Sequence, residues 1–122
     1  MIFIDFSKES SQRQSWVAEV VESICVLLEK EEEILFDRID EFNFEKVTKE
    51  CIVVLSALSD VSVELEELIR NKKITVIKEL RLDQGVNDKT SLIYVEYDNS
   101  AQLKVVLAGI LAKGFTSSST LS

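Results

Sequence analysis

Histidine is the most informative absence, because the chain has none in its 122 residues. Without imidazole there is no Ser-His-Asp triad, no histidine metal site and no histidine general base. Proline is also absent, and glycine occurs only at positions 85, 109 and 114. A GxGxxG fingerprint, a P-loop or another glycine-rich phosphate loop therefore cannot be assembled. These absences exclude the common dinucleotide oxidoreductases and P-loop nucleotidases.

Cysteine and long apolar runs are also scarce. Cys25 and Cys51 each lie inside a short apolar stretch, so we expect two core thiols and no disulfide or metal site. No apolar run approaches the roughly 18 residues that crossing a bilayer requires. The first ten residues lack a basic segment followed by an apolar one, which a signal peptide would show. We therefore expect a cytoplasmic protein with no membrane partner.

Charge narrows the range of partners. Acidic residues outnumber basic ones by 22 to 14, which gives a net charge of −8 and a pI near 4.6. Such a balance disfavours nucleic acid, because phosphate contacts need clustered lysine and arginine. Small ligands and proteins remain open as partners. Apolar residues make up 46% of the chain, which is enough for one globular domain with a core.

Strand-like and helix-like segments alternate along the chain. Apolar runs predict strands at 2–6, 34–39, 51–58, 74–82 and 91–97, and 3.6-residue periodicity predicts helices at about 11–30, 62–71 and 100–113. This order predicts an α/β three-layer sandwich with a mainly parallel sheet, flavodoxin-like in architecture. We assign residues 1–115 to one domain and 116–122 to a polar tail. A hairpin across the turn at 83–90, and hence an α+β fold, is the alternative.

Helix boundaries follow from capping chemistry. Ser11 with Gln14 fits a capping box, Ser59 or Ser62 suits the start of the second helix, and Ser100 that of the last. Asp5 lies in an apolar strand, where a carboxylate needs a hydrogen bond or a shifted pKa.

Four segments together resemble a Toll/interleukin-1 receptor (TIR) domain. They are the first strand and its serine-bearing loop, the second strand ending at Asp37, the third strand ending in serine, and the helix start that follows: "IFIDFSKES", "ILFDRID", "CIVVLSALSD" and "SVELEEL". In that last segment many TIR domains carry Trp-Cys-x-x-Glu-Leu. Here Val63 and Glu64 replace Trp and Cys, while Glu67 and Leu68 match Glu-Leu. The resemblance covers roughly residues 2–78.

The resemblance also implies a chemistry. Some TIR domains cleave NAD+ at the nicotinamide–ribose bond, which would make Glu67 the catalytic carboxylate and Ser7, Ser56 and Trp16 ligand contacts. A carboxylate can stabilise the oxocarbenium-like ribose that nicotinamide leaves behind. Such a reaction would take NAD as substrate and would require no metal or further cofactor.

The departures favour a different role. The segment at 41–50 is short and contains no glycine, where TIR domains usually hold a glycine-bearing loop and a longer helix. We therefore expect an intracellular TIR-like signalling module that acts by homotypic or heterotypic protein assembly. NAD+ hydrolysis by Glu67 is the alternative. A degenerate receiver-like regulatory domain that binds a regulator without phosphorylation is the second alternative, although the third strand ends in Leu55-Ser56-Ala57 where receivers place a phosphorylatable Asp.

Overall fold

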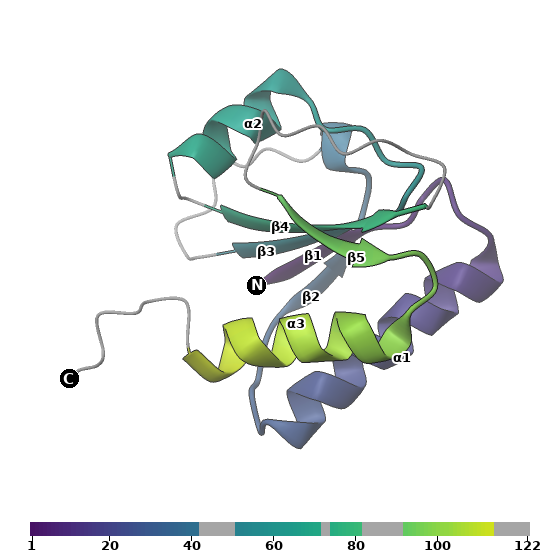
Figure 1. The fold of residues 1–122 in the computed structure, drawn as a ribbon, viewed down its shortest axis with the longest axis vertical. Helices are drawn as coiled ribbons and strands as arrows, with labels where there is room; N and C mark the ends of the chain where they lie inside the picture. The colour runs from purple at the N-terminus through teal and green to yellow at the C-terminus, as the bar shows by residue number, and fades with distance from the viewer. Residues whose placement is uncertain (42–50, 72–73, 82–91, 114–122) are drawn as a thin grey trace.

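The computed structural model describes residues 1–41, 51–71, 74–81 and 92–113 (Figure 1). Strands and helices alternate through these residues, as the apolar runs and the helical periodicity predict. Their bounds are β1 Ile2–Asp5, α1 Ser11–Leu27, β2 Ile34–Phe36, a 3-10 turn η1 Ile39–Glu41, β3 Cys51–Leu55, α2 Val63–Arg70, β4 Ile74–Leu80, β5 Ile93–Glu96 and α3 Ser100–Lys113.

The strands form one parallel sheet in the order β2-β1-β3-β4-β5. Phe3 of β1 lies between Leu35 of β2 and Val53 of β3, and Ile77 of β4 pairs with Ile93 of β5. The predicted flavodoxin-like α/β sandwich is confirmed. Because β4 and β5 run in parallel, the hairpin alternative is excluded.

Helices cover both faces of the sheet, which gives three layers (Figure 1). On one face α1 and α3 pack side by side, and on the other α2 packs against β4. Alternation along each strand sends successive side chains to opposite faces. The α1/α3 face buries Ile2, Ile4, Phe6, Val17, Val20, Val21, Ile24, Cys25, Ile52, Val54, Ile77, Val95, Leu103, Leu107 and Leu111. The α2 face buries Phe3, Cys51, Val53, Leu55, Leu65, Ile69, Ile74 and Val76.

The starts of two helices differ from the sequence prediction by one residue. Ser10, not Ser11, caps α1, because its Oγ accepts the N–H of Arg13 at 3.2 Å. Asn99, not Ser100, caps α3, because its Oδ1 accepts the N–H of Gln102 at 2.9 Å. Both are the ordinary reach of a short polar side chain to the third residue ahead. The capping of α2 by Ser62 agrees with the prediction.

Several predictions concern other parts of the chain. The second and third strands end at Phe36 and Leu55, earlier than expected, because polar turns follow them. Cys25 and Cys51 are free and buried, as predicted.

Three segments lie outside the described residues: 42–50, the turn at 83–90 and the tail at 116–122. No helix in the described ranges is long and apolar enough to cross a membrane.

Candidate functional site

Asp5 ends β1, which lies next to the central strand β3, and folds with this strand order bind ligands between the carboxyl ends of β1 and β3. Its side chain is turned to the α2 face and is only 5% exposed. The carboxylate accepts hydrogen bonds from Ser7 N at 3.0 Å, Ser7 Oγ at 2.6 Å and Ile39 N at 2.9 Å. The hydrogen bonds that an acid in an apolar strand requires are therefore supplied by two neighbouring loops.

The loop after β3 closes over the carboxyl end of β1. Ser59 Oγ donates to the Asp5 carbonyl at 3.2 Å, and Ser56 Oγ and Ser59 Oγ lie 3.2 Å apart. The backbone N–H of Leu58 also donates to Ser56 Oγ at 3.3 Å. Both serines are buried. Their hydroxyl groups thus bind protein atoms in the crevice between β1 and β3.

Lys78 of β4 holds the same loop from the other side. Its Nζ donates to the carbonyl oxygens of Ser56 and Ala57, each at 3.1 Å. Burial lowers the pKa of Lys78, although the nearby Asp60 and Glu79 carboxylates oppose the shift. Within the described residues no carboxylate lies at ion-pair distance from this amine. The amine therefore fastens the β3–α2 loop to β4 through neutral carbonyl groups.

A second polar cluster lies on the α1/α3 face, around Arg13 in the first turn of α1. Its Nε contacts Glu9 Oε1 at 3.0 Å, its Nη1 contacts Asp98 Oδ1 at 3.1 Å, and its Nη2 forms an ion pair with Glu79. The Glu79 side chain is 1% exposed, and its second oxygen accepts the Asp98 N–H at 3.1 Å. The cluster joins α1, β4 and the turn before α3.

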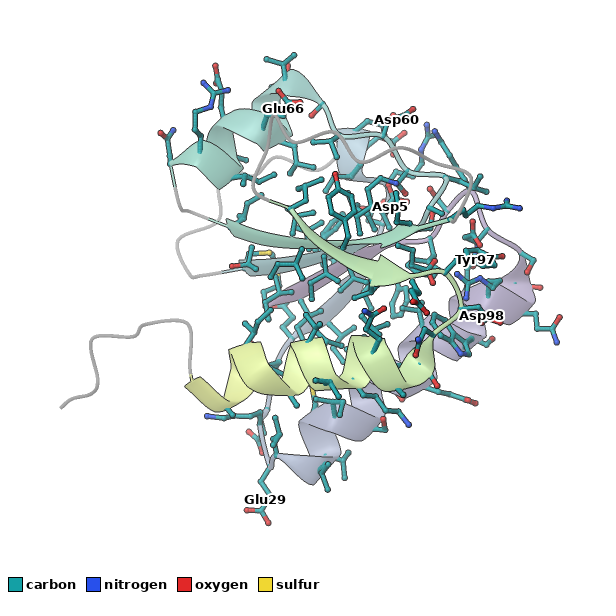
Figure 2. The ribbon with its side chains drawn as sticks, viewed as in Figure 1. Asp5, Glu29, Asp60, Glu66, Tyr97 and Asp98 are labelled. Carbon is teal, nitrogen blue, oxygen red and sulfur yellow. The ribbon has the colours of Figure 1, made fainter. Side chains whose placement is uncertain are left out.

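Aromatic rings enclose the same guanidinium. The Cζ atom of Arg13 lies 4.4 Å from the ring centroid of Tyr97, 4.5 Å from that of Trp16 and 5.5 Å from that of Phe6. Figure 2 shows Tyr97 and Asp98 together at the end of β5 that leads into α3. Burial alone would lower the pKa of Arg13, but hydrogen bonds to Glu79 and Glu9 outweigh it and raise the pKa. The guanidinium is therefore charged and held by the fold itself.

A pocket of about 250 Å³ opens beside these clusters, at the carboxyl ends of β1 and β2. Buried Ile4 and Phe6 and half-exposed Phe36 form its apolar part. Its polar lining comes from Ser7, Gln14, Asp37 and Arg38. The Gln14 side chain is fixed by donation to the carbonyls of Phe6 and Glu9. The pocket thus lies on the β1/β2 side of the sheet edge, away from the closed β1/β3 crevice.

The four residues expected to form a ligand site lie in different surroundings. Ser7 lines the pocket, and Ser56 is buried in the β1/β3 crevice. Trp16 is half-buried against Arg13 on the α1/α3 face of the sheet. Glu67 is exposed on α2 and does not line the pocket. Asp5 connects two of the four, through the side chain of Ser7 and the loop that contains Ser56.

Sequence reasoning missed the Arg13–Glu79 pair and the role of Lys78. The sequence did carry one indication of a buried charge. Two charged residues, Lys78 and Glu79, lie near the end of a strand whose other residues are mostly apolar. A buried acid requires a cation or several donors. The sequence does not indicate which cation, since Arg13 is 66 residues away. In the described part of the chain, no three His, Cys, Asp or Glu side chains gather as a metal site.

Comparisons of the chain with protein-family models, with curated proteins and with solved structures find no match. The architecture is therefore the level at which the chain is assigned: a flavodoxin-like α/β sandwich with an all-parallel sheet of order 2-1-3-4-5.

Proposed function

We propose that the chain is an interaction module that works by assembling with other proteins, including copies of itself. The observation that supports this proposal is the closed crevice between the carboxyl ends of β1 and β3. Ser59 seals it through the Asp5 carbonyl, and Lys78 fastens the same loop through two carbonyls. Folds with this strand order use that crevice for ligands. Because this crevice is closed, we assign the binding of partner proteins to the outer surfaces of the helices and loops.

Exposed apolar side chains support an assembly role. Val26 and Leu27 at the end of α1 are 77% and 73% exposed, and Val63 and Val105 at helix surfaces are 69% and 71% exposed. Large apolar side chains at that level of exposure are available for burial against a partner. The net charge of −8 favours proteins with basic surfaces over nucleic acid.

Within this class we infer a TIR-like signalling module. The order of the four matching segments supports the inference, and the parallel α/β sandwich is compatible with it. The departure at 41–50 affects a segment that the resemblance assigns both to assembly and to access to the active site, and Val63 and Glu64 depart at the start of α2. The outer surfaces of α1 and α3 lie outside both departures.

Sedimentation velocity of the purified chain tests the proposal, over protein concentrations from about 1 μM to about 1 mM. We expect the sedimentation coefficient to rise with concentration. Val105→Ser and Val26→Ser should each shift the rise to higher concentration, because each removes an exposed apolar side chain from a helix surface. A chain that remains monomeric throughout and also consumes NAD+ would contradict the proposal.

NAD+ hydrolysis by Glu67 is the competing proposal, and the position of Ser7 on the pocket wall favours it. It requires the exposed Glu67 carboxylate to reach a ligand held near Ser7. A receiver-like regulatory domain is a third proposal, supported by the strand order that receivers share with flavodoxin. Both would be favoured by small-molecule turnover or binding without self-association.

A further inference from the structure

The pocket at the carboxyl ends of β1 and β2 is lined by two aromatic rings, of which one is exposed. Phe6 contributes a buried ring, and Phe36, the last residue of the short edge strand β2, is 45% exposed. Ile4 completes the apolar part. Its volume of about 250 Å³ is below the roughly 300–1,000 Å³ of pockets that hold drug-sized ligands. It is suited to a single side chain.

The turn at residues 37–41, which supplies part of the pocket lining, carries an excess of negative charge. Arg38 is the one cation in the pocket lining, and its guanidinium is already paired with Asp40 at 3.2 Å and Glu41 at 3.4 Å. Asp37 adds a third carboxylate to the same turn. Beneath Ser7, the Asp5 carboxylate binds neutral donors and has no ion-pair partner among the described residues. A phosphate or carboxylate entering the mouth of the pocket beside this turn would meet repulsion, whereas a cation would be attracted.

The protein already shows which group fits such surroundings. Arg13 lies 5.5 Å from the centroid of the same Phe6 ring, with aromatic neighbours and carboxylates around its guanidinium. Cations bind aromatic faces through the ring quadrupole, and the attraction grows where water is partly excluded. The pocket also combines an aromatic ring, that of Phe36, with a carboxylate, that of Asp37. The space beside them is open to a partner.

We propose that this pocket receives an arginine or lysine side chain from a basic segment of a partner protein. The inference rests on the proposed assembly function and names the chemistry of one contact in it. The aliphatic part of the incoming side chain would pack on the exposed part of Phe36, and its charged end would meet Asp37 at the mouth.

NMR titration of the full chain tests the proposal, with a short glycine/serine peptide that carries one central arginine. The same peptide with citrulline is the control, since citrulline keeps the shape but removes the charge and has a carbonyl oxygen in place of one NH2 group. We expect the arginine peptide to shift the backbone amide resonances of Phe36, Asp37 and Arg38. Binding should be about 5–10-fold weaker for the citrulline peptide, as loss of a cation–π contact and an exposed ion pair implies.

Two variants and two controls locate the contact. Phe36→Ala and Asp37→Asn should each weaken binding of the arginine peptide by about 5-fold, because each removes one of the two attractions. Arg70→Gln and Glu64→Gln, which change exposed residues on α2, should leave it unchanged. Amide spectra of all four variants report directly whether the fold is intact.

Three results would overturn the inference: no amide shift at the pocket at about 10 mM peptide, equal binding of the citrulline peptide, or equal loss in the α2 controls. Self-association without any peptide shift would remove this pocket contact and leave the assembly proposal standing. Peptide binding by a strictly monomeric chain would remove self-association from the assembly proposal and leave the contact with a basic partner standing.

Discussion

The surroundings of Arg13 differ from those of an ordinary surface arginine. Its side chain is 13% exposed, and it forms ion pairs with Glu9, Glu79 and Asp98. Glu79 is buried, so its charge depends on the guanidinium for compensation. Breaking a buried pair by removing one partner leaves an uncompensated charge, whereas removing both partners together costs far less.

We therefore expect Arg13→Met to lower the free energy of unfolding by about 3–5 kcal/mol. The double variant with Glu79→Met should recover more than half of that loss, because no buried charge is left unpaired. Urea denaturation measures both values. Arg70→Met changes an exposed arginine on α2 and should stay within about 0.5 kcal/mol of the parent. Equal losses for Arg13→Met and Arg70→Met would show that the buried pair contributes nothing.

The Cys51 thiol gives a second test at the level of one residue. Burial raises its pKa to about 11, from an ordinary value of 9.0. Between these two values the unfolded chain releases the thiol proton and the native chain keeps it, so stability falls as pH rises. The contribution of this thiol is fully present below pH 9.

We expect the parent protein to lose roughly 2 kcal/mol relative to Cys51→Val between pH 8 and pH 10.5. Valine fills a similar volume and does not titrate, so other groups, including Lys78, cancel in the comparison. Urea denaturation at each pH provides the difference. A stability difference that does not change with pH would mean that the thiol ionises equally in both states.

At the scale of the elements, the helix caps separate what sequence can predict from what it cannot. Ser10 and Ser11 are adjacent, and both suit the start of α1 by residue type. The structure selects Ser10, whose Oγ accepts the Arg13 N–H, because Gln14 reaches back to Phe6 and Glu9 and does not complete a capping box.

Ser10→Ala should therefore lower the free energy of unfolding by about 1 kcal/mol, while Ser11→Ala should change it by less than about 0.5 kcal/mol. Thermal or urea unfolding of the pair makes the comparison at neighbouring positions of the same helix. A larger loss at Ser11 than at Ser10 would restore the capping box as the start of α1.

The strands could be predicted because a strand buried on both faces is a continuous apolar run, as at Cys51–Leu55. The direction of β5 could not, because an apolar segment after a turn pairs equally well either way by pattern alone. The candidate site, too, could be predicted only in part from the sequence pattern. Asp5 could be recognised as needing donors, but its partner Ile39 is 34 residues away.

At the scale of the whole molecule, the polar groups at the sheet edge serve the fold. Four polar side chains at the β1/β3 crevice form hydrogen bonds with one another or with nearby backbone atoms. They are those of Asp5, Ser56, Ser59 and Lys78. No buried side-chain nitrogen or oxygen in the described residues lacks a hydrogen-bond partner. The polar groups of this crevice already form hydrogen bonds with protein atoms, so few of them are left to bind a substrate. We therefore assign the function to the outer surface.

NAD+ turnover by the purified chain is the most direct test of that assignment, measured up to protein concentrations of about 1 mM. Glu67→Ala and Glu64→Ala provide a matched pair of exposed acids on α2. An assembly module should leave NAD+ intact in all three proteins. Turnover by the parent and by Glu64→Ala, lost in Glu67→Ala, would contradict the account and make the chain a hydrolase.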